Sequence, residues 1–314
     1  MDGFEDIAGD DSGSLEGKMK KKIMLVAGAR PNFIKIAPLL KEFSKHIETF
    51  ETFLVHTGQH YDLEMSGMFF EGLQIPDPDI YLNVGSHSHA VQTARIMIAF
   101  EKVVIKNKPN LLIVVGDVNS TVACALVASK LGIKVAHVEA GLRSFDRTMP
   151  EEINRVVTDS ISDYLFVSEK SGMRNLENEG VAPKKTHFVG NLMIASLIWA
   201  DPLVDKSSIV TMLNLTAKRF GVVTLHRPAN VDSDESLLEI YDILRKISEK
   251  IELIYPVHPR TRSMLDRFGL LKKLKELTNL RLIDPLGYLD FIRLMKDSRF
   301  VLTDSGGIQE ETTA

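Results

Sequence analysis

Short apolar runs alternate with amphipathic stretches along most of this 314-residue chain. In the first half, runs rich in Val, Ile and Leu predict strands at 23–27, 51–56, 111–115, 135–139 and 164–168. Stretches with a helical apolar period predict helices at 38–46, 90–106, 120–131 and 151–162. A repeated strand–helix order is typical of a parallel sheet with helices on both faces. The sequence therefore predicts an α/β fold.

The same alternation starts again after residues 191–218. Here the pattern predicts strands at 221–225, 252–257, 281–283 and 300–303, with helices at 236–250 and 288–296. We expect two Rossmann-like domains that face each other across a cleft, the first at 19–190 and the second at 191–314. Ligands of such sheets bind beyond the carboxyl ends of the strands, so motifs at those ends are the candidates for a site.

The two ends of the chain differ from this pattern. Residues 1–18 contain six acidic residues among Gly and Ser with no apolar period, which predicts a disordered acidic tail. The chain stops at Ala314, barely one turn into the helix that a Ser-Gly-Gly turn opens. We therefore expect the second domain to be incomplete at the C-terminus.

Composition excludes several classes of function. A net charge of −4 and a pI near 6.2 give no basic surplus for a nucleic-acid partner. The single cysteine, Cys124, excludes an internal disulfide and falls in a helix-like run, where a buried structural thiol is expected. The N-terminus lacks the features of a signal peptide, and apolar runs such as 111–115 are too short to span a membrane. We expect a soluble, cytoplasmic protein with no membrane partner.

One glycine turn near the end of the chain has the sequence expected of a diphosphate site. The predicted strand at 300–303 leads into Ser305, Gly306 and Gly307, and an apparent helix follows. Bare N–H groups and the positive end of a helix suit a diphosphate. Glu311, one turn further on, is placed to hold a ribose diol. A tight glycine turn with no ligand is the alternative interpretation.

A second motif, GARPNFIK, follows the first predicted strand. It has one glycine, Gly28, where a dinucleotide fingerprint needs three, so neither NAD nor FAD is indicated. Arg30 and Lys35 are placed to clamp a phosphate from a turn and the first turn of a helix. A loop arginine and a solvated lysine are an equally good interpretation of this segment alone.

Three further motifs place carboxylates at the same predicted sheet edge. Asp117 lies in GDVNST, Glu139 in HVEAGLR and Glu151 in PEEINR. An aspartate at a strand end can instead form a turn, with Ser120 as the N-cap of the next helix. Likewise, Pro150 followed by Glu151 is good chemistry for a helix start with no function required.

Two histidine motifs end strands of the second half. His226 and Arg227 lie together in TLHRPANVD, and His258 lies in YPVHPR. A single histidine in a cleft is more often a hydrogen-bonded structural residue than a catalyst. No motif has the spacing of a metal site.

Eight motifs in order, GARPNFIK, HTGQH, GDVNST, HVEAGLRS, PEEINR, TLHRPANVD, YPVHPR and DSGGIQEE, give the chain a specific resemblance. From about Lys21 to Ala314 it resembles the non-hydrolysing UDP-N-acetylglucosamine 2-epimerases. The resemblance implies the two-domain fold of many nucleotide-sugar glycosyltransferases, known as GT-B. It implies interconversion of UDP-GlcNAc and UDP-ManNAc with neither NAD nor an obligatory metal. It also implies a homodimer and a supply of sugars for cell-surface polysaccharides.

Site residues follow from the resemblance motif by motif. It implies catalytic roles for Asp117, Glu139, Glu151 and His226, the last near the diphosphate. It implies substrate contacts by Arg30, Lys35, Phe291, Ser305, Gly306, Gly307 and Glu311, with Phe291 beside the uracil. It implies an effector site, as in bacterial members, at Gln59, His60 and His258. Asn32 stands where many relatives have Glu, and both versions occur in the family.

The chemistry of such a reaction accounts for these residue types. Carbon 2 of the sugar has no adjacent carbonyl, so its hydrogen becomes acidic only when UDP leaves carbon 1. Cations would stabilise the leaving diphosphate, and repulsion among carboxylates would raise the pKa of at least one of them, so that an acid and a base coexist. Two alternatives stay open: a hydrolysing relative that releases ManNAc and UDP, and a nucleotide-sugar binding fragment without turnover.

Overall fold

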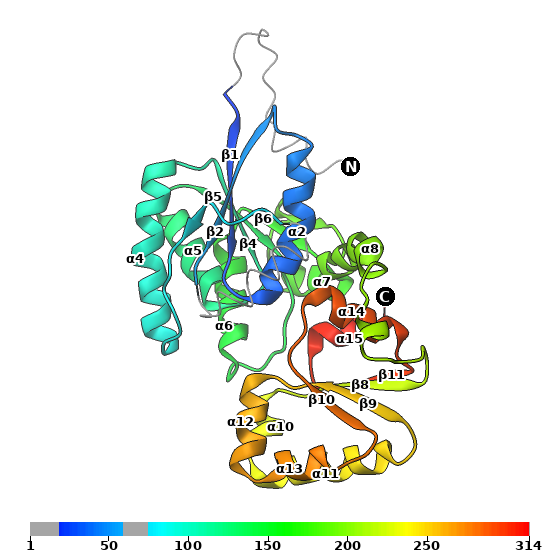
Figure 1. Cartoon of the computed structure of the whole chain (residues 1–314). Helices are drawn as coiled ribbons and strands as arrows, with labels where there is room; N and C mark the ends of the chain where they lie inside the picture. Colours follow the sequence, from blue (N-terminus) through cyan, green and yellow to red (C-terminus); the bar gives the residue numbers. More distant parts are fainter. Residues whose placement is uncertain (1–18, 59–74, 314) are drawn as a thin grey trace. The chain divides into compact units, whose positions relative to one another are not determined.

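The computed structural model describes residues 19–58 and 75–313, which form two compact units. Unit 1 comprises the described residues up to Ser196, and unit 2 comprises residues 197–313. Each unit is a sheet flanked by helices (Figure 1). The predicted effector residues Gln59 and His60 lie outside the described residues.

Unit 1 contains a seven-stranded parallel sheet with the order β3-β2-β1-β4-β5-β6-β7. Its strands are β1 (Lys21–Ala27), β2 (Phe50–His56), β3 (Ile80–Tyr81), β4 (Leu111–Val115), β5 (Lys134–Val138), β6 (Tyr164–Val167) and β7 (Thr186–Phe188). All five residues of β4 are buried, as expected of a central strand covered on both faces. The predicted α/β fold with a parallel sheet is confirmed.

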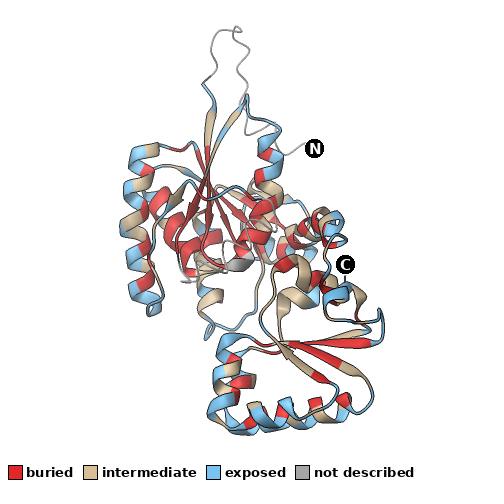
Figure 2. Ribbon diagram, in the orientation of Figure 1, coloured by how far each residue is buried: buried red, intermediate tan, exposed pale blue. Residues whose placement is uncertain are grey.

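The helices of unit 1 cover both faces of this sheet. They are α2 (Arg30–Ser44), α4 (His89–Asn107), α5 (Asn119–Lys130), α6 (Pro150–Ile161) and α7 (Lys170–Asn178), with a 3-10 turn at Pro183–Lys185. Met24 and Leu112 point to the face that α4 and α5 cover, where they share a core with Phe100 and the buried Cys124. Because successive side chains of a strand alternate, Ile23 and Leu25 point to the other face. Buried residues follow the strands in Figure 2.

Unit 2 contains a four-stranded parallel sheet with the order β10-β9-β8-β11. Its strands are β8 (Phe220–Thr224), β9 (Glu252–Pro256), β10 (Leu280–Ile283) and β11 (Phe300–Thr303). Its helices are α9 (Ile209–Met212), α10 (Pro228–Val231), α11 (Asp234–Ser248), α12 (Pro259–Arg267), α13 (Leu270–Lys275), α14 (Tyr288–Asp297) and α15 (Gly306–Thr313), and α8 (Leu192–Val204) leads into the unit. One core packs α11 to α13 on the sheet, and a second packs α9 and α14 on the opposite face.

Both sheets reverse their strand order at one point. In unit 1 the chain builds outwards from β1 to β2 and β3, then returns to place β4 on the other side of β1. In unit 2 it builds from β8 to β9 and β10, then returns to place β11 beside β8. The loops that follow two such neighbouring strands diverge, and the crevice between them is where open α/β sheets bind ligands.

The first helix differs from its predicted bounds. The predicted start at Pro38 is wrong, because α2 begins at Arg30 and contains Pro38. Proline has no N–H for the carbonyl four residues earlier, which is that of Ile34. The Ser196 hydroxyl lies 2.6 Å from Ile34 O and supplies the missing donor. A contact distant in sequence therefore lets the helix continue through Pro38.

Other differences have local causes. Ser120 is not an N-cap: the N-cap of α5 is Val118, and the buried Ser120 hydroxyl bonds that of Thr57 at 2.8 Å. Residues 191–218, predicted as a pause in the pattern, contain α8 and α9. The edge strands β3 and β7 were missed because two or three residues show no alternation.

We predict that Ser196→Ala lowers the free energy of unfolding by about 1–3 kcal/mol, because it leaves the buried Ile34 carbonyl without a donor. In a Pro38→Ala background the new N–H bonds this carbonyl, so the same substitution should cost much less. Urea unfolding followed by circular dichroism measures both effects. Ser160→Ala, at an exposed serine of α6, is the control. Equal losses in the two backgrounds would contradict the role given to Ser196.

Candidate active site

The candidate residues of unit 1 lie on the loops that follow β4 and β5 and on the first turns of α2 and α6. Asn32, in the first turn of α2, is 3% exposed and makes hydrogen bonds to both neighbouring segments. Its Oδ1 accepts hydrogen bonds from the N–H groups of Gly28 (3.2 Å) and Ala29 (2.9 Å). Its Nδ2 donates to Val115 O, at the end of β4, over 3.0 Å. Asn32 therefore ties the loop after β1 to the neighbouring strand across the point where the strand order reverses.

Lys35 and Glu139 form an ion pair at this edge. Lys35 Nζ lies 2.6 Å from Glu139 Oε2, and both side chains are mostly buried. Glu139 has a φ of +70°, a left-handed conformation that is rare for residues other than glycine. Such backbone strain persists where the surroundings fix it, and it is common at functional sites. Its N–H is held by Phe166 O at 3.0 Å.

Asp117 follows β4 and pairs with a cation from α6. Arg155 donates to Asp117 Oδ2 over 2.6 Å and lies 3.2 Å from Glu152. Asn154 Nδ2 donates to the Asp117 carbonyl over 2.9 Å. Arg155 was absent from the predicted site, although it stands four residues after Glu151 in the PEEINR motif. That spacing gave no sign of the observed pairing, because Arg155 contacts Asp117 and Glu152 and no ion pair joins it to Glu151.

The two neighbouring glutamates of α6 have different surroundings. The buried Glu152 carboxylate accepts hydrogen bonds from the N–H groups of Ser144 (2.9 Å) and Phe145 (3.0 Å). These bonds help lower the pKa of Glu152 against the opposing effect of burial. Glu151, the predicted site residue, is half-buried and makes no ion pair with a described residue. Glu152 therefore anchors a loop, while Glu151 keeps its carboxylate available.

Cations accompany two of the three predicted carboxylates, since Asp117 pairs with Arg155 and Glu139 pairs with Lys35. The division into acid and base by mutual repulsion stays a prediction. Arg30 is the first residue of α2, and its side chain is outside the described part.

In unit 2, Asp304 links the two strands that flank the reversal. It follows β11, and its carboxylate accepts hydrogen bonds from the N–H groups of His226 (3.0 Å) and Arg227 (2.9 Å) after β8. Asn230 Nδ2 donates to it over 3.0 Å. Burial acts to raise the pKa of Asp304, but these hydrogen bonds lower it. Sequence reasoning missed Asp304 because it lies inside the DSGG motif and was assigned no role.

The Ser-Gly-Gly turn has the predicted geometry. Helix α15 begins at Gly306, directly after Ser305, whose N–H donates to Thr303 Oγ1 over 3.0 Å. A Cβ added at Gly306 would lie 3.6 Å from a terminal nitrogen of Arg227. The positive end of the helix and a guanidinium therefore point to one place, which suits an anion such as a diphosphate.

Glu311 lies in the same helix and is buried. Burial raises its pKa to about 7, although a hydrogen bond with Tyr288 acts in the opposite direction. Burial and the proximity of Glu311 also raise the pKa of Tyr288. Near neutral pH, Glu311 is therefore divided between its neutral and charged forms.

The remaining predicted residues of unit 2 are also placed. His258 is the N-cap of α12, and its ring centroid lies 6.0 Å from that of His226. Phe291, on α14, is half-buried and packs on the core of the face that α9 covers. The effector role of His258 and the uracil contact of Phe291 stay predictions.

No helix within 19–58 and 75–313 is long and apolar enough to cross a membrane. No group of three or more His, Cys, Asp or Glu residues in the same ranges is arranged to hold a metal ion.

Comparison with solved structures defines the class. Phytolacca americana UGT2, solved in complex with UDP-2fluoro-glucose and pterostilbene, shares the fold at a TM-score of 0.53 and 13% identity, covering 94% of this chain and 78% of that chain. Similarity is much greater to Methanocaldococcus jannaschii UDP-GlcNAc 2-epimerase, solved in complex with UDP-GlcNAc and UDP. There the TM-score is 0.84 at 42% identity, over 92% of this chain and 80% of that one. The fold is that of GT-B-type proteins with two Rossmann-like units.

Sequence comparison gives the family. Residues 42–314 match the family model described as UDP-N-acetylglucosamine 2-epimerase. A Methanococcus maripaludis UDP-N-acetylglucosamine 2-epimerase homolog is 49% identical over 92% of this chain and 80% of its own length. A Pseudomonas aeruginosa UDP-2,3-diacetamido-2,3-dideoxy-D-glucuronate 2-epimerase is 41% identical over the same shares. The chain belongs to the UDP-N-acetylglucosamine 2-epimerase family.

We predict that Glu311 makes unit 2 less stable as the pH rises from about 4.5 to about 7. The folded state holds the proton up to a higher pH than the unfolded state does, so stability is full below the unfolded pKa and is lost through this window. Glu311→Gln should be more stable than wild type at pH 8, by on the order of 2–3 kcal/mol, with the difference vanishing near pH 4.5.

Urea unfolding followed by the fluorescence of Trp199, the single tryptophan and a residue of unit 2, measures this difference. Glu276→Gln, at an exposed residue, is the matched control and should show no such pH dependence. A stability difference that is the same at pH 5 and pH 8 would refute the raised pKa.

Proposed function

We propose that this protein is a non-hydrolysing UDP-GlcNAc 2-epimerase, an isomerase that interconverts UDP-GlcNAc and UDP-ManNAc. The observation that carries the proposal is the chemistry at the two strand reversals. Unit 1 places carboxylates beside cations at its edge, and unit 2 places a helix N-terminus beside a guanidinium. Family membership and the bound UDP-GlcNAc and UDP of the M. jannaschii relative support it.

Unit 2 would hold the nucleotide. The N–H groups at Gly306 and Gly307 and the Arg227 guanidinium would bind the diphosphate, and His226 would lie near it. Glu311 would accept hydrogen bonds from the ribose diol, and Phe291 would contact the uracil. As UDP leaves carbon 1, these fixed positive groups would stabilise the charge that develops on the diphosphate.

Unit 1 would transfer the protons. Loss of UDP gives carbon 1 oxocarbenium character, so a carboxylate can remove the hydrogen of carbon 2 and leave 2-acetamidoglucal. Reprotonation on the opposite face and return of UDP then invert carbon 2. Asp117, Glu139 and Glu151 are the proposed proton-transfer groups, and Lys35 and Arg155 would keep two of them ionised and oriented. Arg30 would contact the leaving phosphate.

The 41% identity to the P. aeruginosa relative favours a second candidate substrate within the same chemistry. That relative is named for a diacetamido uronate sugar, while the M. jannaschii UDP-N-acetylglucosamine 2-epimerase is 43% identical. Because the two identities are so close, both UDP-sugars should be offered to the protein. A kcat/KM that is higher for the UDP-linked diacetamido uronate than for UDP-GlcNAc would make the uronate the preferred substrate.

We predict that UDP-GlcNAc incubated with the protein in heavy water yields UDP-ManNAc deuterated at carbon 2, because elimination exchanges that hydrogen with solvent. Asp117→Asn and Glu151→Gln should each lower turnover by roughly 100-fold or more while UDP affinity stays within a few-fold. Proton NMR and mass spectrometry of the products measure the isotope, and calorimetry measures UDP binding.

Glu48→Gln, at an exposed glutamate of unit 1, is the control and should behave as wild type. Free ManNAc as the product would favour the hydrolysing alternative, and binding of UDP-GlcNAc with no product would favour a binding protein. Retention of the original hydrogen in UDP-ManNAc would refute the elimination mechanism.

We also propose a homodimer formed through α4. Val91, Ile98 and Ile105 are exposed on this helix at seven-residue intervals, with Ile98 63% exposed. Side chains seven apart lie on one face of a helix, and such an apolar stripe is typical of helix pairing.

Residues 19–190 and 191–314 are the proposed domains, and the change of unit at Ser196 supports a boundary in this region.

Ile98→Glu should convert the dimer to a monomer, because the stripe would then bury a charge. Light scattering after size-exclusion chromatography measures the mass. Ile47→Glu changes an equally exposed isoleucine away from α4 and should leave the mass unchanged. A wild-type monomer, or a dimer that persists in Ile98→Glu, would contradict the α4 interface.

A further inference from the structure

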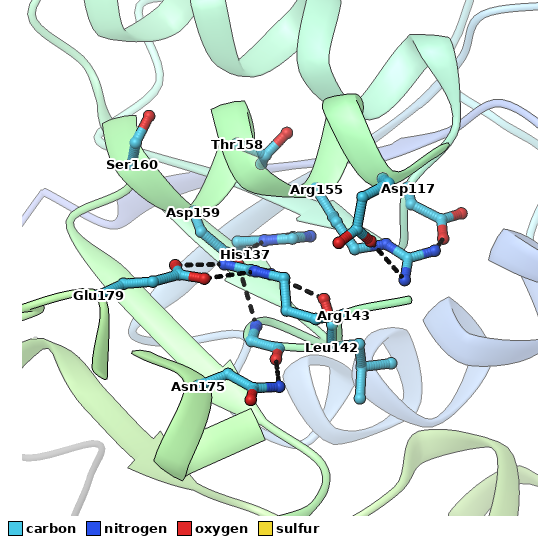
Figure 3. Close-up of polar contacts among 12 residues, drawn as sticks. Asp117, His137, Leu142, Arg143, Arg155, Thr158, Asp159, Ser160, Asn175 and Glu179 are labelled. Carbon is cyan, nitrogen blue, oxygen red and sulfur yellow. Dashed lines mark hydrogen bonds and ion pairs between the residues drawn. The ribbon is translucent and has the colours of Figure 1, made fainter. Parts of the chain in front are cut away.

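A histidine buried beneath the carboxylates of unit 1 has hydrogen-bond acceptors at both ring nitrogens. His137 lies on β5 and is 1% exposed. Its Nε2 is 2.9 Å from Gly116 O. Its Nδ1 is 2.6 Å from Asp159 Oδ1, in the polar cluster that Figure 3 shows. Neither the predicted site nor the proposed mechanism uses this side chain.

The contact at Nε2 shows that this ring nitrogen of His137 is protonated. A backbone carbonyl can only accept a hydrogen bond, so Nε2 carries hydrogen and donates to Gly116 O. In a neutral imidazole, Nδ1 would then be an unprotonated acceptor. An acceptor 2.6 Å from a carboxylate oxygen is stable only if the carboxyl group carries the proton.

The surroundings of Asp159 exclude that alternative. Its Oδ2 accepts hydrogen bonds from Gly141 N–H at 3.0 Å and from the Arg143 guanidinium at 2.7 Å. Two donors on one oxygen, one of them a permanent cation, hold this buried carboxylate in its ionised form. Nδ1 must therefore donate as well, and His137 has two N–H groups.

The resulting charges balance within the cluster. His137 and Arg143 supply two positive charges, and Asp159 and Glu179 supply two negative ones. The Arg143 side chain is 2% exposed and donates two hydrogen bonds of 2.7 Å to Glu179. A buried charge is tolerated when it is paired and hydrogen-bonded in this way.

The bond from His137 controls the peptide that precedes Asp117. Gly116 has a φ of +70°, and its N–H donates to Val138 O over 3.1 Å. Its carbonyl belongs to the peptide that leads into Asp117, so the bond from His137 fixes the plane of that peptide. Rotation of the peptide would redirect the Asp117 backbone and move its carboxylate away from Arg155.

The same cluster fixes the turn that carries Glu139. Asp159 holds Gly141 N–H, and Gly141 has a φ of +79°. A side chain could not be added there, because a Cβ at Gly141 would lie 2.5 Å from Gly172 O. Both carboxylates of the edge, Asp117 and Glu139, are thus anchored to one buried charged cluster.

We propose that His137 is a positioning residue that acts as a buried imidazolium, orienting Asp117 through the Gly116 carbonyl while Asp159 supplies the counter-charge. The proposal rests on the proposed function for its effect on catalysis. The protonation of His137 follows from the hydrogen bonds alone and can be measured separately.

NMR spectroscopy of the whole protein labelled with ¹⁵N at histidine tests the protonation near neutral pH. We expect both ring nitrogens of His137 to carry slowly exchanging protons and to correlate with them directly. His187, a half-buried histidine on β7, serves as the reference for an ordinary ring. A His137 ring with one unprotonated nitrogen would overturn the proposal, whether or not any variant folds.

Kinetics tests the positioning role. His137→Phe removes both donors and should lower kcat by about 10- to 100-fold, with KM within about threefold of wild type. His137→Gln keeps an amide donor that can reach the Gly116 carbonyl, so it should recover part of kcat. His187→Gln is the matched control and should leave both constants unchanged.

The outcomes separate this proposal from the proposed function. Folded His137→Phe with kcat within about twofold of wild type would overturn the positioning role. A kcat for His137→Gln no higher than that of His137→Phe would overturn the role of the Gly116 contact. Absence of epimerase activity in the wild type would refute the proposed function, and the NMR result would still decide the charge of His137.

Discussion

The reversal of strand order in each sheet is the constraint on which the rest of the structure depends. It leaves two diverging loops at neighbouring strands, and those loops must be held without the hydrogen bonds of a sheet. In unit 1, Asn32 joins the loop after β1 to Val115 at the end of β4. In unit 2, the Asp304 carboxylate after β11 holds the N–H groups of His226 and Arg227 after β8. A buried polar side chain thus links the same pair of positions in both units.

Charge pairing then decides what each edge can do. In unit 1, Glu139 pairs with Lys35 and Asp117 pairs with Arg155 at the edge. The cluster of His137, Asp159, Arg143 and Glu179 below the edge is neutral overall. Such an edge can move a proton between groups whose positions are fixed. In unit 2, Arg227 and the start of α15 leave a local positive excess that an anion can neutralise. The edge of unit 1 is therefore suited to proton transfer, and the edge of unit 2 is suited to binding a diphosphate.

Much of the fold could be predicted from the sequence, as could the places of several candidate residues in it. The pattern predicted β4 and β11 with their observed bounds, and it placed Asp117, Glu139 and the Ser305 turn after strands, where the structure has them. Contacts between distant residues could not be predicted. The helix at Pro38 depends on Ser196, and the ionised Asp159 depends on Arg143 and His137. Arg155 resembles any helical cation in sequence until Asp117 is seen beside it.

The strand reversal of unit 2 is the proposed binding site for the diphosphate of a UDP-sugar. The most direct test is a crystal structure of the protein with UDP bound. We expect phosphate oxygens within hydrogen-bond distance of the N–H groups of Gly306 and Gly307 and of the Arg227 guanidinium, with a ribose hydroxyl at Glu311. A well-ordered UDP bound elsewhere on the protein, with the start of α15 free of phosphate, would contradict it.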